Sequence, residues 1–262
     1  MELVTLIGVL LGIAAVFGGA LLEGLHLGAI LQGTAAVIVF GGTFGAMLVS
    51  FPQQDIKNAF KMLKVVFLKV ETDVRDVIEE IIKIASVARK EGVLAIEGMR
   101  DSIQDPLFKK SIKYVIDGFE PQTVKDIMTA EIDLVFEEEE QAGKVWEGTG
   151  GYAPTIGIIG AVLGLIHVMA GLNEPGADLG GGIAVAFVAT VYGVGSANLI
   201  FIPMGTKLKR KATMRAMIKE VVKLGVIGIQ EGLNPHFLRE KLEVYVEEHL
   251  RKPSDAGAGD KA

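Results

Sequence analysis

The chain has 262 residues, of which 50% are hydrophobic and 33 are glycine, and its formal net charge is −6. Frequent glycine in so apolar a chain is typical of a protein with several membrane spans and not of a soluble domain. The acidic balance argues against a nucleic-acid partner, which needs a basic face, and the absence of cysteine excludes disulfides, thiolate nucleophiles and cysteine-ligated metals.

Two apolar runs open the chain and predict a first pair of spans. They cover Leu3–Leu22 and Leu27–Phe51, and a helix needs about 20 apolar residues to cross a bilayer. Only Met1 and Glu2 stand ahead of the first run, so this run lacks the basic segment of a secretory signal peptide and is predicted to be retained. Residues 1–51 are therefore predicted to form a transmembrane hairpin.

Mixed charge replaces the apolar pattern in residues 52–149, which predicts a helical domain outside the membrane. Residues 56–70 carry an apolar stripe with lysines around the rest of the helix. This pattern fits either a helix on the anionic membrane surface or an ordinary packed helix. Val74–Ile103 and Gln122–Lys144 are predicted as two further helices, and the acidic run 137–140 is interpreted as a solvated face.

The longest apolar runs, Gly150–Leu172 and Leu179–Met204, contain no Asp, Glu, Lys or Arg. Their short connection predicts an antiparallel hairpin of two spans within residues 150–206. Cytoplasmic helices are predicted for residues 207–250, and a disordered tail for residues 251–262, whose composition cannot bury enough apolar surface to fold. The expected fold is an all-α integral membrane protein with four transmembrane helices and a large helical domain.

The distribution of basic residues predicts the orientation in the membrane. Lysines and arginines follow the second and fourth spans, on one side of a four-span chain, and short loops rich in Lys and Arg stay in the cytoplasm. The other side has acidic residues and one histidine but no Lys or Arg: Glu23, His26, Glu174 and Asp178. Both termini and the large middle segment are therefore predicted to be cytoplasmic.

A few residues inside the last two spans are unusual for lipid-facing helices. Pro154 and Pro203 each free a backbone carbonyl, and Thr190 places a hydroxyl midway along the fourth span. Packing residues and residues of a polar path both fit this pattern. His167 is the one imidazole within a span, and it either serves the function or forms a hydrogen bond at the interface.

Motifs for catalysis and metal binding are missing. The four histidines lie in different segments, and no Gly-rich phosphate loop or Gly-x-Ser-x-Gly elbow occurs, so neither an enzyme nor a metal or cofactor site is predicted. The predicted spans also contain no carboxylate. If the chain belongs to an ion path, another polypeptide must supply the acidic group.

Several segments together resemble the MotA family of flagellar stator proteins. They are Gly41–Ala46, Ala88–Glu97, Ala153–His167, Ala189–Pro203 and Gln230–Pro235. The resemblance implies a bacterial cytoplasmic (inner) membrane protein that forms a homo-oligomeric ring around a MotB-like partner. In the family that partner has a single span with the ion-binding Asp, and ion flow is converted into torque on the rotor.

The resemblance also assigns residues to the ion path. Thr190 would line it, aided by the loosened backbones near Pro154 and Pro203. Sodium-driven members of the family carry threonines at the positions of Ala161 and Ala189. A dehydrated sodium ion needs several oxygen ligands, whereas a proton needs only a carboxylate and a hydrogen-bonded chain. The conducted ion is therefore predicted to be the proton and not sodium.

Arg89 and Glu97 match the charged residues through which the family contacts the rotor's switch protein. The two residues are eight positions apart on the helix predicted over Val74–Ile103. They would therefore lie within roughly 80° of each other around the helix axis, so one partner surface could meet both. Two solvated helix charges are the simpler interpretation without the resemblance.

Two other functions stay open at this point. Energisers of the TolQ and ExbB type have one span before their large cytoplasmic segment, whereas this chain is predicted to have two. A passive membrane scaffold without an ion path would tolerate valine at Thr190. The order of spans favours the stator over the energiser but leaves the scaffold open.

Overall fold

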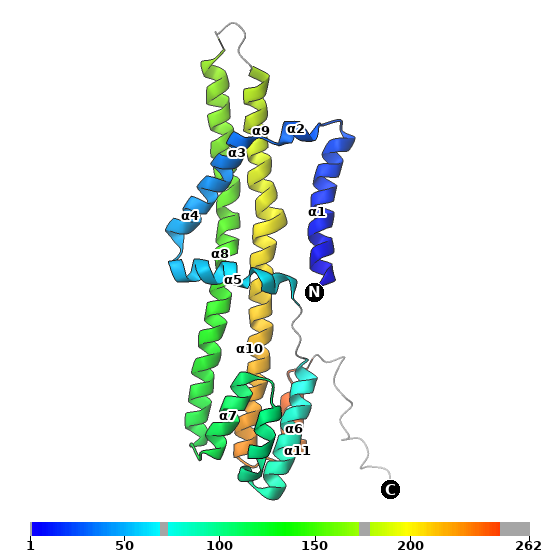
Figure 1. Cartoon of the computed structure of the whole chain (residues 1–262), viewed down its shortest axis with the longest axis vertical. Helices are drawn as coiled ribbons and strands as arrows, with labels where there is room; N and C mark the ends of the chain where they lie inside the picture. Colours follow the sequence, from blue (N-terminus) through cyan, green and yellow to red (C-terminus); the bar gives the residue numbers. More distant parts are fainter. Residues whose placement is uncertain (1, 69–72, 173–178, 247–262) are drawn as a thin grey trace. The chain divides into compact units, whose positions relative to one another are not determined.

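The computed structural model describes residues 2–68, 73–172 and 179–246, and the regular elements in these ranges are all helices (Figure 1). The predicted tail, residues 251–262, lies outside them. The chain divides into two compact units. The membrane unit comprises residues 1–69 and 137–212 and contains the apolar runs; the second unit comprises residues 70–136 and 213–262.

Helices of very different length follow one another along the chain. In chain order they are α1 (Leu3–Leu22), α2 (Leu27–Ile30), α3 (Gly33–Ala36), the π-helix η1 (Val37–Gly41), α4 (Gly42–Ser50), α5 (Gln53–Phe67), α6 (Val74–Glu91), the 3-10 helix η2 (Val93–Ser102), α7 (Pro106–Ile116), α8 (Pro121–Ala170), α9 (Leu179–Ser196), the π-helix η3 (Ala197–Phe201), α10 (Ile202–Gln230) and α11 (Pro235–Glu243).

Four helical stretches in the described residues are long and apolar enough to span a membrane, which confirms the predicted number. They are Leu3–Leu22, Gly33–Ser50, and parts of Pro121–Ala170 and Leu179–Gln230. The third and fourth spans do not end where their apolar runs end. Each is part of a longer continuous helix, so the predicted helix Gln122–Lys144 and the third span are one element.

The second span begins later than predicted, at Gly33 instead of Leu27. Leu31 and Gln32 are not helical, and they separate α2 from α3. The Tyr192 hydroxyl of α9 accepts a hydrogen bond from the Gln32 N–H (3.2 Å) and donates one to the Ile30 carbonyl (2.6 Å). A tertiary contact therefore satisfies backbone groups that a break at membrane depth would otherwise leave unpaired.

Glycines at a seven-residue spacing on α8 let its backbone approach the helix formed by α9, η3 and α10. They are Gly143, Gly150, Gly157 and Gly164, and a methyl group added at any of them would lie 2.5 to 3.0 Å from an atom of that helix. A seven-residue repeat keeps one stripe facing its partner along two supercoiled helices. Small residues thus hold the hairpin of the third and fourth spans together.

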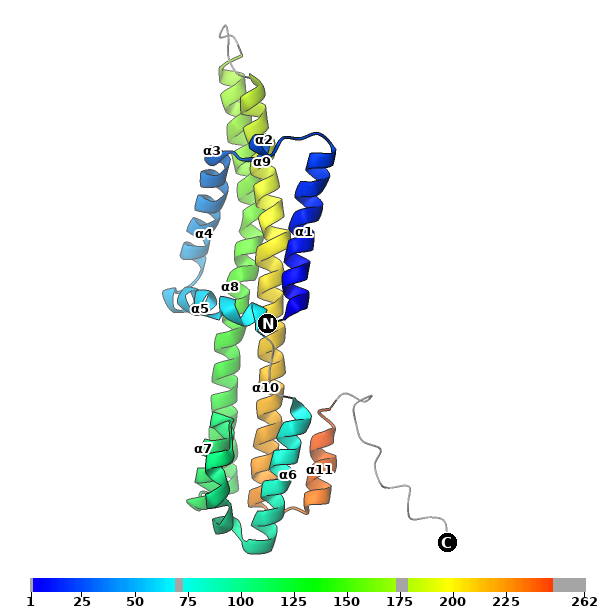
Figure 2. The ribbon, with the colours of Figure 1, turned by 45° about the vertical axis from the view of Figure 1, so that its right-hand side comes forward.

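Helix α5 packs on the membrane unit through one of its faces. Ala59, Met62 and Val66 are buried in the same core cluster as Trp146 of α8. The indole Nε1 of Trp146 donates a hydrogen bond to the Ala59 carbonyl at 3.1 Å. Figure 2 shows α5 crossing α8 between the end of α4 and the start of α1.

The second unit has its own apolar core, formed by α6, α7, α11 and parts of α8 and α10. Its largest fully buried side chains include Phe108, Ile112 and Leu238. The prediction of a single helix over Val74–Ile103 is wrong. Helix α6 ends at Glu91 because Gly92 adopts a φ of +89°, which is strained for other residues, and a 3-10 helix follows.

Candidate functional site

Thr190 lies on α9 with its side chain half-buried. Its hydroxyl donates to the Ala186 carbonyl of the preceding turn at 3.4 Å, so the helix itself supplies a partner for the O–H. The oxygen lone pairs remain able to accept a hydrogen bond from outside the helix. A helical hydroxyl in this position can pass or orient a proton without leaving an unpaired polar group in the membrane.

The two alanines named with Thr190 occupy different surroundings. Ala189 is fully buried, and a methyl group added at Gly160 of α8 would lie 2.8 Å from the Ala189 Cβ. Ala161 is half-buried on α8. Position 189 is thus enclosed between helices, whereas position 161 is partly open, so the structure does not place both on one accessible surface.

The structure brings the backbone turns of the two prolines close together. The ring of Pro154 cannot donate to the Gly150 carbonyl four residues earlier. A methyl group added at Gly150 would lie 3.2 Å from the backbone nitrogen of Ile202, the residue before Pro203. In an α-helix the ring of Pro203 would crowd the carbonyl four residues earlier. That carbonyl lies in the π-helix η3, which ends at Phe201. Both irregular turns therefore meet at one level of the hairpin.

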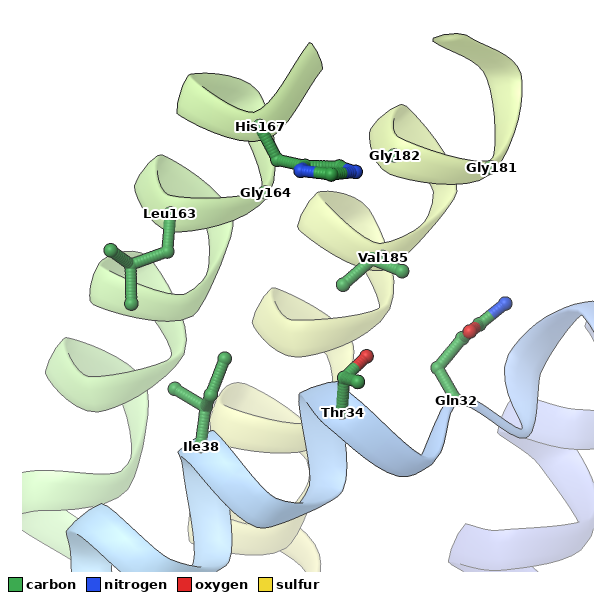
Figure 3. Close-up of a pocket in the computed structure, with 9 residues that line it drawn as sticks. All are labelled: Gln32, Thr34, Ile38, Leu163, Gly164, His167, Gly181, Gly182 and Val185. Atoms are coloured by element: carbon green, nitrogen blue, oxygen red, sulfur yellow. The ribbon is translucent and has the colours of Figure 1, made fainter. Parts of the chain in front are cut away.

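A pocket of about 570 Å³ lies where the start of the second span meets the α8–α9 hairpin (Figure 3). His167 is exposed at one side, with its ring directed across toward Gly182, and Gln32 and Thr34 lie at the other side. The sequence interpretation singled out His167 but missed Thr34 of α3 and Gln32, which directly precedes that helix. Their polarity in an apolar run was the available signal.

Thr190 is not among the residues that line this pocket. Gly164 lines the pocket, and a methyl group added there would lie 3.0 Å from the Ala186 backbone nitrogen. Ala186 is also the residue whose carbonyl accepts the Thr190 hydrogen bond. The pocket lining thus contains His167 but none of the predicted path residues, so the structure does not join His167 to them.

The residues predicted to meet the rotor are both exposed but lie on different elements. Arg89 is in the last turn of α6, and Glu97 is in η2, beyond the turn at Gly92. The predicted angular relation along one helix is therefore wrong. Within the described residues neither side chain forms an ion pair or hydrogen bond, so both charges are available to another protein.

A charged cluster with a buried lysine lies at one end of the spans, and the sequence interpretation missed it. Lys211 of α10 is 4% exposed, and its ammonium group donates to the carbonyls of Val65 (2.9 Å) and Val66 (3.0 Å) at the end of α5. It also lies 2.8 Å from a Glu2 carboxylate oxygen, and Lys207 lies 2.7 Å from the same oxygen. The hydrogen bonds from Lys207 and Lys211 lower the pKa of Glu2 to about 2.

Comparisons with known proteins cover nearly all of the chain. Residues 6–92 match the model of the motility protein A N-terminal region, and residues 99–221 match that of the MotA/TolQ/ExbB proton channel family. Motility protein A of Helicobacter pylori is 34% identical, with 94% of this chain and 95% of that protein covered.

Two solved structures are also similar over nearly their whole length. The structure of MotAB from C. jejuni has a TM-score of 0.90 at 29% identity and covers 97% of this chain and 100% of its own. The flagellar MotAB stator complex from Bacillus subtilis has a TM-score of 0.86 at 30% identity, with 94% and 97% covered.

Proposed function

Because the chain belongs to the MotA/TolQ/ExbB proton channel family and matches motility protein A over 94% of its residues, we propose that it is a flagellar stator subunit. With a MotB-like partner it forms a proton channel and converts ion flow into torque on the rotor. The observation that carries this function is the match, over nearly the whole chain, to the solved MotAB stator complexes.

The need for a partner follows from the spans themselves. None of the four spans contains a carboxylate, so the group that binds the ion must come from another polypeptide. The similar solved structures are complexes of MotA with MotB. A ring of copies of this chain around a single-span partner that carries an Asp supplies that group next to Thr190.

The arrangement of spans favours the stator over the related energisers. Two spans, Leu3–Leu22 and Gly33–Ser50, precede the extramembrane segment that includes α6, whereas TolQ and ExbB proteins have one. The family is one of channels and not of enzymes, and no enzymatic activity is proposed. In the described residues no group of three or more His, Asp or Glu is placed to hold a metal ion.

The basic residues set the proposed orientation. Lysines of α5 and the lysines and arginines after the fourth span lie on one side of the four spans, and such residues stay in the cytoplasm. We therefore propose that both termini are cytoplasmic, in a protein of the bacterial inner membrane as the family implies. The second unit is the cytoplasmic part, from which a rotor contact can be made.

Replacement of Thr190 by valine tests the proton path against a passive scaffold. The variant is expected to lower proton uptake by proteoliposomes that hold the complex with its partner about tenfold or more, because a hydrogen bond to a charged group is worth roughly 1.5–3 kcal/mol. Thr190→Ser keeps the hydroxyl and should retain most of the flux. Wild-type proton uptake in the valine variant would leave the scaffold as the better account.

Reversal of the charges at Arg89 and Glu97 tests the rotor contact. The variants Arg89→Glu and Glu97→Lys are expected to reduce swimming speed while membrane insertion stays normal, since exposed substitutions change stability by about 0.5 kcal/mol or less. The matched controls are Lys90→Glu and Glu91→Lys, which reverse neighbouring exposed charges of α6. Full motility of the Arg89→Glu, Glu97→Lys double variant would remove the proposed contact.

The proposed ion is the proton. Alanine at positions 161 and 189 adds no side-chain oxygen to the hydroxyl of Thr190, and position 189 is enclosed against Gly160. One hydroxyl makes a poor replacement for the water shell of sodium. Cells that depend on this chain and its own partner should swim equally fast with and without sodium at a fixed proton-motive force. Loss of swimming on removal of sodium would contradict the proposal.

A further inference from the structure

Helix α5 is fixed at both ends to the same edge of the spans. It begins at Gln53, three residues after the second span ends at Ser50. Its last residue, Phe67, accepts a backbone hydrogen bond from Glu2, directly before the first span, at 2.8 Å. A helix of 15 residues is about 22 Å long, so α5 reaches from the end of the second span to the start of the first and crosses the helices at that end of the spans (Figures 1 and 2).

The outward face of α5 is basic. Lys57, Lys61 and Lys64 are exposed and follow one another at the spacing of a single helical stripe. The buried stripe lies on the opposite side of the helix and packs against α8. Within the described residues the three lysines have no ion pair or hydrogen bond. Their ammonium groups therefore point away from the helix bundle at the level where the spans leave the membrane.

An aromatic side chain accompanies the lysines. Phe60 is 46% exposed, and its ring lies 5.0 Å from that of Trp146 in an edge-on arrangement. Helices that lie in a membrane interface combine exposed apolar residues with lysines that extend toward the lipid phosphates. The one acidic residue of α5, Asp55, is in its first turn and is half-buried.

We propose that the face formed by Lys57, Lys61 and Lys64 binds the headgroups of anionic phospholipids. The three unpaired cations lie at headgroup level, and the negative surface potential of the cytoplasmic leaflet attracts basic segments at about 1 kcal/mol for each Lys. This face anchors α5 to the lipid around the spans. It goes beyond the proposed stator function, because it needs neither ion flow nor a rotor.

The single tryptophan of the chain provides the measurement. Trp146 lies beside α5, so lipids with brominated chains that gather at this helix quench its fluorescence. The full-length protein is placed in two sets of phosphatidylcholine vesicles. In one set a fraction of the lipid is replaced by brominated phosphatidylglycerol, and in the other the same fraction is replaced by brominated phosphatidylcholine. We expect about fivefold or greater preference for phosphatidylglycerol, and the preference should fall with added salt.

The variant with Lys57, Lys61 and Lys64 all replaced by Gln should lose this preference. Its quenching by brominated phosphatidylcholine should equal that of the wild type, which shows that Trp146 keeps its surroundings. Replacement of three exposed lysines of the second unit, Lys113, Lys125 and Lys241, by Gln changes the net charge equally and should preserve the preference. Equal quenching by both lipids in the wild type, or an unchanged preference in the first variant, would overturn the proposal. Binding of this face to an acidic soluble protein but not to anionic lipid would also overturn it.

Discussion

Gly193→Ala is expected to disrupt the hairpin of the third and fourth spans and to stop rotation. The added methyl group would lie 2.5 Å from the Ala153 carbonyl oxygen and 3.0 Å from the Gly157 Cα. Both are backbone atoms, so no side-chain rotation can relieve the clash and the helices must separate. Overpacking of this kind costs about 1–3 kcal/mol. Thermal unfolding in detergent and swimming speed measure the loss.

Gly195→Ala is the matched control, because it makes the same change two residues further along α9. A methyl group added at Gly195 has no heavy atom within 4 Å. The substitution should leave both the unfolding temperature and motility near their wild-type values, and alanine favours helix over glycine. If both variants were equally stable and motile, the close approach of α8 and α9 would not be a requirement of the fold.

Lys211→Met should destabilise the membrane unit by about 2–4 kcal/mol. The buried ammonium group caps carbonyls at the end of α5 and pairs with Glu2, and its removal leaves these acceptors without that donor. Arg210→Met removes a neighbouring exposed charge and should have little effect. Equal unfolding temperatures for the two variants would show that the buried Lys211 contributes no stability.

The same cluster predicts a dependence on pH. The pKa of Glu2 is lowered from 4.5 to about 2 by its hydrogen bonds with Lys207 and Lys211. A lowered pKa in the folded state means that the stabilisation is complete above pH 4.5 and is lost as the pH falls toward 2. Unfolding of the wild type should therefore become easier over this range. Glu2→Gln should remove most of this dependence of stability on pH. A Glu2→Gln variant with the same pH profile as the wild type would contradict the prediction.

The sequence predicts the membrane fold well because length and polarity decide it locally. Four apolar runs without charged residues predict four spans, and the structure has them. The glycines at 143, 150, 157 and 164 were visible in the sequence as a seven-residue repeat, although only the structure shows which helix they face. Local patterns thus identify the elements but not their partners.

Two predictions failed because distant or backbone effects override the local pattern. The helix predicted through Val74–Ile103 breaks at Gly92, where a positive φ redirects the chain despite an amphipathic pattern on both sides. The start of the second span depends on Tyr192, which lies 160 residues away from Gln32. Hydrophobic periodicity contains no information about either effect.

The candidate site divides in the same way. Pro203 could be identified as an irregular point from residue type alone, and a π-helix does end two residues before it. The burial of Lys211 could not be predicted, since its acceptors belong to residues about 145 positions earlier in the chain. A basic residue after a span is usually interpreted as a solvated flank, and only the folded structure shows that this one is structural.

The central claim is that this chain generates torque together with a partner that supplies the ion-binding carboxylate. The most direct test is the rotation of tethered cells of a bacterium that lacks its own stator, with this chain and a MotB-like partner expressed separately and together. Rotation is expected only when both are present, and it should stop when the Asp in the partner's span is replaced by Asn. Rotation with this chain alone, or no rotation although both proteins form a complex in the membrane, would contradict the account.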